Sequence, residues 1–379
     1  MTSPPAGGLY VHLPFCPYIC PYCDFAKWPL RRSQAENYLS ALEAEIEAAP
    51  AFRATTLFLG GGTPNTYDPE RLAALVERLR ARFALPAGAE TTVELNPDLE
   101  LCTGFAAYRS AGINRASFGV QSFVPEELLT LGRRHSPADV VEAVRRARAA
   151  GFANVSLDLI FGVPGQTEAS WRRSLDAALA LEPEHISTYG LTVEEGTPYA
   201  AWFAREPGSF STQDCEAELY SDVIERLSAA GYEHYEISNF ARPGFRSAHN
   251  ANYWANGEYL GLGVGAASYL GGVRSVRTRD LSIYCDAALG GLPVPVEAER
   301  LTGDARAGEA VMLALRTAEG VDLAGFAERY EVDFMRRYRG VLEDMQRDGM
   351  LEVTATHVRL TLRGRFVAND VCAAFVVAA

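Results

Sequence analysis

Residues 9–191 alternate short runs rich in β-branched and aromatic residues with longer stretches of helical periodicity. Six of the short runs are predicted strands, at residues 9–13, 55–59, 91–95, 115–120, 155–160 and 185–189. Helices are predicted between them, at residues 34–48, 70–83, 105–111, 138–150 and 169–181. Successive strands lie about 25 to 45 residues apart, which suits right-handed crossovers between parallel strands. The alternation therefore predicts an α/β fold, either a partial barrel or an open doubly wound sheet; periodicity alone does not separate the two.

The pattern changes after residue 191. Residues 192–291 are less regular, with one predicted helix at 214–230, a β-like run at 232–240 and a glycine-rich stretch that ends at Gly272. From about residue 302, helices at 304–317, 322–329 and 333–348 precede a hairpin-like run at 351–361 and a last helix after Gly364. Helices followed by a hairpin resemble a winged helix. We therefore predict three domains, at residues 1–200, 201–300 and 301–379.

The charge of the chain limits its partners. The 379 residues carry a formal net charge of −13, whereas broad nucleic-acid binding requires a basic surface. Residues 301–379 contain ten arginines and twelve acidic residues, so a packing or lid role is predicted for this segment rather than DNA binding. An anionic membrane would also repel the chain overall, although a local patch can still dock on its surface.

Neither a signal peptide nor a membrane span is predicted. The first residues, MTSPPAGG, have no basic region and no apolar core, and no apolar run approaches the roughly 20 residues of a membrane helix. A cytoplasmic protein is expected, in which thiols stay reduced. Of the seven cysteines, three are clustered. The other four are predicted to be buried structural thiols, at Cys102, Cys215, Cys285 and Cys372.

The clustered cysteines are Cys16, Cys20 and Cys23, with the spacing Cys-x3-Cys-x2-Cys. Three thiolates this close together will bind a soft metal centre, but they are too few for a closed tetrahedral site. An iron–sulfur cluster held by three cysteines leaves one iron free to bind another ligand. The alternative is a zinc knuckle with His12 as the fourth ligand. His12, however, lies inside a predicted strand between two apolar residues.

Glycine and polar residues recur where the predicted strands end. The sequence GGGTP at residues 60–64 follows the second strand, Glu94 and Gln121 end the third and fourth, and Asp158 lies in the fifth. The sixth strand ends in STYGLT. Glycines let a ligand approach the backbone, and enzymes with parallel β/α folds carry their chemistry at these strand ends. Each feature alone also fits an ordinary loop or helix cap, but their recurrence predicts a site.

Together these residues resemble the radical S-adenosylmethionine (SAM) superfamily, and within it the branch of oxygen-independent coproporphyrinogen dehydrogenases and their relatives. The resemblance extends from LYVHLPFC, at residues 9–16, to the C-terminal domain. It implies a partial barrel of six β/α units, with a [4Fe-4S] cluster on the cysteine loop. It also implies that SAM binds the fourth iron, and that an electron from the cluster cleaves SAM to a 5′-deoxyadenosyl radical.

The resemblance implies a role for each residue that matches a family motif. Cys16, Cys20 and Cys23 would ligate the cluster. The expected SAM contacts are Tyr10, Tyr22, Gly61, Gly62, Thr63, Glu94, Gln121, Arg133 and Asp158. Carboxylates suit a sulfonium cation and a ribose diol, so the chemistry of these residues agrees with the match.

Three features of the chain resemble HemW, the haem chaperone family of the same branch. The dehydrogenases have a fourth cysteine two residues after the third, where this chain has Phe25. They also have a longer N-terminal arm than the 15 residues that precede Cys16. Residues 249–254, HNANYW, match an HNxxYW motif that is typical of HemW.

The resemblance to HemW implies haem binding. His249 would be an axial ligand of the haem iron, and Tyr253 and Trp254 would cover a porphyrin face. Three arginines on a β-like run, Arg274, Arg277 and Arg279, could pair with the propionates. Apart from the family pattern, His249 is more simply a hydrogen-bonded loop histidine, and the arginines are a solvated strand face.

The expected function is that of a haem chaperone, which binds a [4Fe-4S] cluster, SAM and haem and hands haem to an acceptor protein. The alternative is a radical SAM oxidoreductase or methyltransferase that acts on a porphyrin, as a coproporphyrinogen III dehydrogenase does. A zinc-binding winged-helix regulator is disfavoured by the charge. The acceptor protein and the oligomeric state are left open.

Overall fold

The structure, a computed structural model, describes residues 4–377 and contains all six predicted parallel strands. In spatial order they are β1 (Ala6–Leu13), β4 (Arg53–Gly61), β5 (Thr91–Leu95), β6 (Arg115–Gln121), β7 (Val155–Phe161) and β8 (His185–Gly190). The five predicted helices are α1 (Arg32–Ala48), α2 (Pro69–Arg82), α3 (Phe105–Ser110), α5 (Pro137–Ala149) and α6 (Glu168–Ala180). The structure adds a short helix, α4 (Pro125–Thr130), which the sequence analysis missed.

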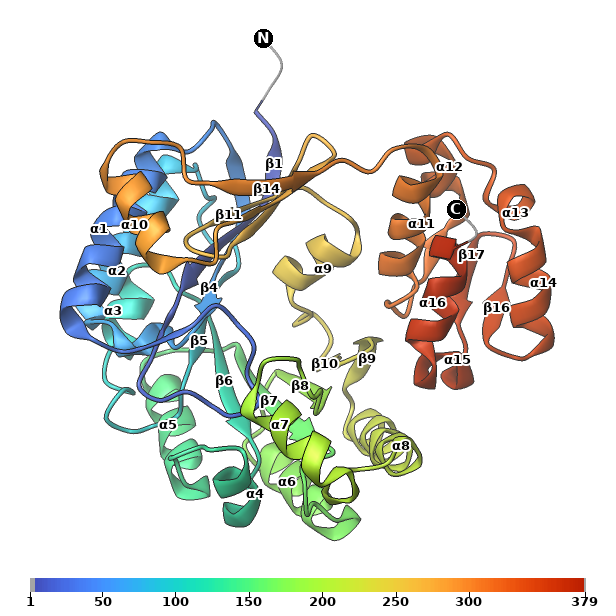
Figure 1. Cartoon of the computed structure of the whole chain (residues 1–379). Helices are drawn as coiled ribbons and strands as arrows, with labels where there is room; N and C mark the ends of the chain where they lie inside the picture. The colour runs from blue at the N-terminus through green and yellow to red at the C-terminus, as the bar shows by residue number, and fades with distance from the viewer. Residues whose placement is uncertain (1–3, 378–379) are drawn as a thin grey trace.

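The parallel strands form a partial barrel. Helices α1 to α6 lie along the outer face of the curved sheet, with the C-terminal domain opposite them (Figure 1). A doubly wound sheet would instead carry helices on both faces. Strands β1 and β7 are buried at nearly every position, as expected for parallel strands that are covered on both sides. The prediction of a partial barrel is therefore confirmed.

The middle of the chain extends both edges of the barrel. Strand β11 (Tyr259–Leu262) pairs in parallel with β1, and β12 (Ala267–Leu270), β13 (Val273–Arg277) and β14 (Val296–Glu299) follow it antiparallel. At the other edge β10 (Asn239–Ala241) pairs antiparallel with β8, and β9 (Glu233–Glu236) pairs with β10. The remaining helices are α7 (Pro198–Arg205), α8 (Gln213–Ala229), α9 (Ala248–Trp254) and α10 (Leu281–Leu289).

Three details of this region differ from the sequence analysis. One helix was predicted within residues 192–291, but the structure has four; α7, α9 and α10 were missed because each has nine residues or fewer, too short to show a clear helical period. The β-like run at residues 232–240 is two strands, β9 and β10, rather than one. The glycine-rich stretch contains strands β11 and β12, because glycine allows their backbones to approach closely. A Cβ atom on Gly261 would lie 2.0 Å from the carbonyl oxygen of Ala267.

The C-terminal domain is winged-helix-like, as predicted. Its elements are α11 (Gly303–Ala314), β15 (Val321–Asp322), α12 (Leu323–Tyr330), α13 (Phe334–Arg337), α14 (Arg339–Arg347), β16 (Leu351–Val353), β17 (His357–Leu360), α15 (Leu362–Phe366) and α16 (Ala368–Val377). The three strands form an antiparallel sheet in the order β15-β17-β16. The predicted helix at 333–348 is divided at Tyr338 into α13 and α14.

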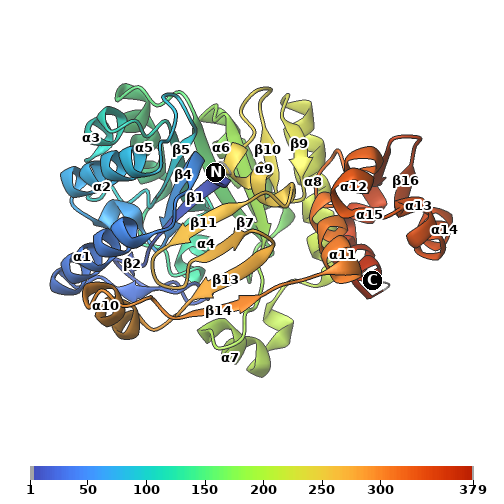
Figure 2. The same cartoon turned by 90° about the horizontal axis from the view of Figure 1, so that it is seen from above.

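Two separate apolar cores stabilise the molecule. One is built from residues between Leu9 and Ala288, and the other from residues between Ala307 and Phe375. The first core continues through residue 200, since strands on both sides of that position share one sheet. The C-terminal domain lies beside β9 and α9 (Figures 1 and 2), where the amide of Ile237 donates to the carbonyl of Arg316 at 3.1 Å.

None of the helices within residues 4–377 is both long and apolar enough to cross a membrane.

Candidate functional site

The cysteine loop is closed at its base by a short parallel ribbon. Strand β2 (Phe15–Cys16) pairs with β3 (Trp28–Pro29). The amide of Trp28 donates to the carbonyl of Pro14 at 2.9 Å, and the amide of Leu30 donates to that of Cys16 at 2.8 Å. The two ends of the loop are thereby held together, so the three cysteines project from a fixed base.

Tyr18, inside this loop, holds it against the loops that follow β5 and α4. Its hydroxyl donates to a carboxylate oxygen of Asp98 at 3.1 Å and accepts from the side-chain amide of Asn96 at 3.1 Å. The guanidinium of Arg134 lies 4.8 Å from the centre of the Tyr18 ring, within range of a cation–π interaction. These contacts place the cysteines over the C-terminal ends of the parallel strands.

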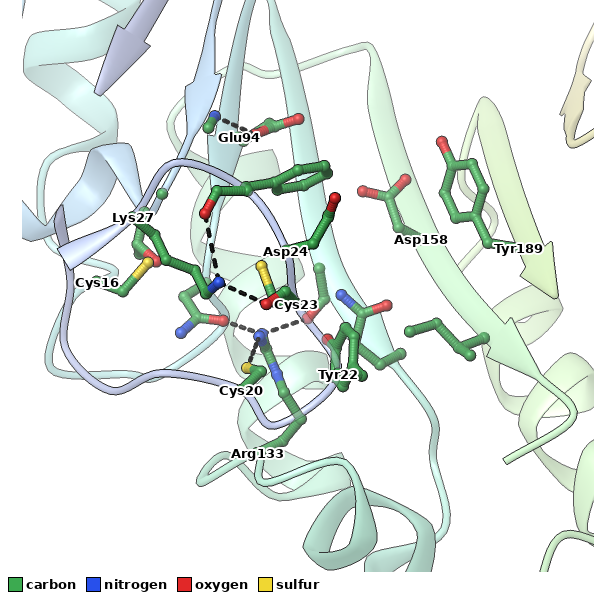
Figure 3. Close-up of a pocket in the computed structure, with 18 of the residues that line it drawn as sticks. Cys16, Cys20, Tyr22, Cys23, Asp24, Lys27, Glu94, Arg133, Asp158 and Tyr189 are labelled. Carbon is green, nitrogen blue, oxygen red and sulfur yellow. Dashed lines mark hydrogen bonds between the residues drawn. The ribbon is translucent and has the colours of Figure 1, made fainter. Parts of the chain in front are cut away.

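A cavity of about 390 Å³, here called the first cavity, lies between the cysteine loop and the strand ends. This volume lies within the range of about 300–1,000 Å³ that is usual for small-molecule sites. Of the residues that the sequence analysis assigned to the cluster and to SAM, the cavity is lined by Cys16, Cys20, Tyr22, Cys23, Gly61, Gly62, Thr63, Glu94, Gln121, Arg133 and Asp158. Figure 3 shows the cysteine sulfurs on one side of the cavity and Asp158 and Tyr189 on the other. Tyr10 is the exception and does not line this cavity.

The three thiols have the chemistry of cluster ligands. All are free, and burial raises the pKa of Cys16 to about 11 and that of Cys23 above its ordinary value. Burial therefore favours the protonated form of Cys16 and Cys23 until a metal centre displaces the protons. Within residues 4–377, no three Cys, His, Asp or Glu side chains converge on the position of a single ion. The thiols instead line one wall of a cavity, which suits a larger centre better than one zinc ion.

Two carboxylates face the thiols across the first cavity. Glu94 accepts from the amide of Gly61 at 3.0 Å, and burial, together with the nearby charge of Asp158, raises its pKa to about 7. Asp158 accepts from the hydroxyl of Ser117 at 3.3 Å, and burial raises its pKa too. Two buried carboxylates with raised pKa values favour a ligand with a positive charge, because such a ligand stabilises their charged forms.

Arg133 links the cysteine loop to strand β6. Its guanidinium donates to the sulfur of Cys20 at 3.5 Å and to the carbonyl of Gly119 at 2.7 Å, and also to the side-chain oxygen of Asn96 (Figure 3). Its Nε is buried and has no hydrogen-bond partner within the described residues. A buried donor without a partner fits a polar ligand in this cavity.

The glycine run also has a packing role, besides the place of Gly61 and Gly62 in the wall of the first cavity. A Cβ atom on Gly60 would lie 2.6 Å from a carboxylate oxygen of Glu94, and one on Gly61 would lie 2.3 Å from the ring of His12. One on Gly62 would lie 2.6 Å from the carbonyl carbon of Pro14. Atoms of the chain, rather than a ligand, therefore occupy the space of all three side chains. The glycines let β4 approach β1 and the start of the cysteine loop.

The structure also reveals site features that the sequence analysis missed. Gln121 has a φ of 68°, at an irregularity in the pairing of β6 with β7 that turns the chain at the cavity wall. Such backbone strain is often found at functional sites. Asn96, Ser117 and Tyr189 also line the first cavity. Asn96 and Tyr189 follow the same strand-end pattern as Glu94, so the pattern could have identified them.

A second cavity of about 510 Å³ adjoins the first, and both have Phe25, Gly61 and Glu94 in their walls. It lies between β1, the antiparallel strands β11 to β13, helix α9 and the C-terminal domain. Its other lining residues are Tyr10, His12, Ala26, Tyr253, Asn256, Tyr259, Gly265, Ala267, Arg274, Val276, Arg279 and Leu313.

His12 lines this second cavity, and its position there decides whether it can be the fourth ligand of a zinc knuckle. Its Nδ1 is 2.9 Å from the hydroxyl of Tyr10, and its Nε2 is 2.7 Å from the carbonyl oxygen of Ala26. Burial lowers the pKa of His12 to about 4, so the ring is neutral. Because His12 does not line the cavity of the three thiols, it is not placed to complete a zinc knuckle.

The HNxxYW motif forms helix α9, and its histidine lies inside the protein. His249 is 1% exposed. Its Nδ1 is 2.8 Å from the hydroxyl of Thr56, its Nε2 is 2.8 Å from that of Tyr253, and its ring stacks on Phe58 at 5.1 Å. Burial lowers the pKa of His249 to about 3. The imidazole thus fixes α9 to β4, and ligation of haem by His249, which stays a prediction, would require one of these hydrogen bonds to break.

The three predicted propionate partners have different surroundings. Arg277 forms a buried ion pair with Glu45 and lies outside the second cavity. Arg274 lines that cavity and pairs with Glu309 of α11. Arg279 lines it as well, and donates to the carbonyl of Asp24 at 2.8 Å.

Comparisons with known proteins give a consistent result. Residues 10–178 match the radical SAM superfamily, and residues 301–367 match the HemN C-terminal domain. The chain is 38% identical to heme chaperone HemW of Bacillus subtilis over 376 residues, which cover 97% of this chain and 98% of that protein. It is 39% identical to heme chaperone HemW of Mycobacterium tuberculosis, with 96% and 93% covered, and 37% identical to that of Escherichia coli, with 70% and 71% covered.

A solved structure supports the same fold. Coproporphyrinogen III oxidase (HemN) from Escherichia coli, a radical SAM enzyme, matches this chain with a TM-score of 0.86 and 25% sequence identity. The match covers 100% of this chain and 91% of that one. Both the barrel and the C-terminal domain therefore have counterparts in that enzyme.

Proposed function

This chain belongs to the HemW family of radical SAM proteins, and from that premise we propose that it is a haem chaperone, which binds haem and passes it to an acceptor protein. The observation that carries the proposal is the similarity, over nearly the whole length of both chains, to relatives named as heme chaperones. The acceptor is a haem protein whose identity the chain does not reveal.

We further propose that Cys16, Cys20 and Cys23 hold a [4Fe-4S] cluster and that SAM occupies the rest of the first cavity. When bound, the cluster would supply one electron to SAM. The chain's own residues hold and orient the ligand: Glu94 and Asp158 face its positive charge, and the Arg133 guanidinium offers hydrogen bonds. Tyr10, which the family resemblance also assigned to SAM, lines the second cavity instead. It would therefore contact SAM only from the side of that cavity.

A second candidate is a radical SAM enzyme that acts on a porphyrin. The similarity to coproporphyrinogen III oxidase over the whole chain favours it. Phe25 argues against it, because an apolar ring stands where the dehydrogenases have a fourth cysteine. The ring is 61% exposed and lies in the walls of both cavities, so this position faces any ligand that spans them.

Product analysis separates the two candidates. The reconstituted protein is incubated anaerobically with coproporphyrinogen III, SAM and a reductant, and the porphyrins are separated by chromatography. We expect coproporphyrinogen III to be recovered unchanged, while the same preparation binds haem. Formation of protoporphyrinogen IX over several turnovers would establish the enzyme and contradict the chaperone proposal.

A further inference from the structure

We propose that the second cavity holds the haem cargo with its propionates on Arg274 and Arg279, and that one propionate takes Arg274 away from Glu309 of α11. This inference rests on the proposed function, since it assumes that the cargo is a tetrapyrrole with carboxylate side chains. It adds the position of the cargo, the groups that recognise it and a link to the C-terminal domain.

The walls of the second cavity suit a flat aromatic ligand. Tyr253 of α9 and Tyr259 of β11 pack edge to face, with ring centres 4.7 Å apart. Tyr10 of β1 and Phe25 of the cysteine loop add two further rings to the walls. Aromatic side chains provide a large apolar contact area at a low cost in side-chain entropy. The volume of about 510 Å³ suits a ligand of the size of a tetrapyrrole.

The two arginines lie where the carboxylates of such a ligand would reach solvent. Arg279 is exposed and donates to a backbone carbonyl, and among the described residues it forms no ion pair with a carboxylate. It can therefore accept a carboxylate without losing an ion pair. Arg277, which lies between them in the sequence, already forms a buried ion pair with Glu45. It is therefore unsuited to bind a propionate.

Arg274 already has a carboxylate partner, and this partner belongs to the C-terminal domain. Its side chain is 35% exposed, whereas that of Glu309 is 9% exposed. Leu313, one turn further along α11, lines the second cavity as well. A propionate bound to Arg274 would therefore compete with Glu309 and weaken one of the contacts that hold α11 against the barrel. Cargo binding and domain contact would be coupled through this one guanidinium.

Haem and its dimethyl ester, titrated separately, test the carboxylate subsite, because the ester lacks both negative charges. We expect the wild-type protein to bind haem about tenfold more tightly than the ester, and the double variant Arg274→Gln/Arg279→Gln to bind both equally. The matched control is Arg300→Gln, which removes an arginine that donates to the carbonyl of Gly271. Because Arg279 is exposed, Arg279→Gln alone keeps the test valid if Arg274→Gln impairs folding.

Glu309→Gln tests the competition. It removes the carboxylate charge that competes with the propionate for Arg274. The affinity for haem should therefore increase several-fold, while the affinity for the ester stays constant. A purely structural role of the ion pair would not increase affinity. The control is Glu319→Gln, which removes an acidic residue of the same domain that pairs with Arg246.

The outcomes also separate this inference from the proposed function. If the wild-type protein binds haem but the double variant discriminates between haem and the ester as the wild type does, the subsite is wrong and the chaperone proposal stands. If the wild-type protein binds no haem, both fail. Unchanged haem affinity in Glu309→Gln would overturn the competition between the propionate and Glu309.

Discussion

The cysteine loop and helix α9 both carry sequence motifs, but they present them in opposite ways. Cys16, Cys20 and Cys23 direct their thiols into the first cavity, whereas the imidazole of His249 is enclosed and hydrogen-bonded at both nitrogens. In the loop the motif residues face a potential ligand. In the helix, the histidine anchors an element and only Tyr253 reaches a cavity.

The contrast shows that a motif can mark a site without supplying its ligands. His249 holds α9 against β4, and this contact places Tyr253 in the wall of the second cavity. Gly8 contributes by leaving space for the ring, since a Cβ atom there would lie 3.1 Å from His249. Positioning therefore explains the places of His249 and Tyr253 in the HNxxYW pattern, whereas packing does not explain three thiols at one cavity.

The largest expected effect is on iron content. We expect about four irons per chain after anaerobic reconstitution of the wild-type protein, and almost none in the triple variant Cys16→Ala/Cys20→Ala/Cys23→Ala. Colorimetric iron and sulfide assays measure this. Cys215→Ala, a half-buried thiol elsewhere in the barrel, serves as the control and should retain the cluster. Stoichiometric zinc without iron in the wild-type protein would disprove the cluster.

A change in the helix motif should instead affect folding. His249→Ala removes a buried ring and leaves the hydroxyls of Thr56 and Tyr253 without their partner, which should cost roughly 3 kcal/mol of unfolding free energy. Tyr253→Phe removes one hydrogen bond and should cost about 1 kcal/mol. Denaturant unfolding of the cluster-free proteins measures both. If His249→Ala were as stable as the wild type while its haem spectrum changed, His249 would be a ligand rather than an anchor.

A similar contrast exists between two neighbouring arginines, Arg277 in strand β13 and Arg279, which lines the second cavity. Arg277→Leu leaves the carboxylate of Glu45 buried without its partner and should destabilise the protein by about 3 kcal/mol. Arg279→Leu removes an exposed side chain and should change stability by less than about 0.5 kcal/mol. Thermal unfolding distinguishes them. Equal losses of stability in the two variants would mean that Arg277 and Arg279 do not differ as a structural and a ligand-facing arginine.

The last expected effect is the dependence of stability on pH that Glu94 causes. Its pKa in the folded state is raised to about 7 from an ordinary value of 4.5, so its contribution is fully present below 4.5 and is lost as the pH rises through 7. Glu94→Gln should therefore gain roughly 2 to 3 kcal/mol relative to the wild type between pH 5 and 8. Unfolding of the cluster-free proteins across this range measures it. If the unfolding free energies of the two proteins changed with pH in the same way, the pKa of Glu94 in the folded state would be ordinary.

Much of this fold and site could be predicted from the sequence, because strand periodicity and strand ends depend on local patterns. The strand-end rule placed Glu94, Gln121 and Asp158 at one cavity. The strands of the glycine-rich stretch were missed because close backbone approach, rather than β-propensity, places them. The surroundings of His249 could not be predicted, since its partner Thr56 is 193 residues away in sequence.

The most direct test of the account is a haem titration of the purified protein, with its cluster and as the triple cysteine variant, followed by the Soret absorbance. If the thiols serve the cluster and the cargo has its own cavity, both forms should bind about one haem per chain with similar affinity. Loss of haem binding in the triple variant, or binding only when the cluster is absent, would make the cysteines the haem ligands and contradict the separation of the two sites.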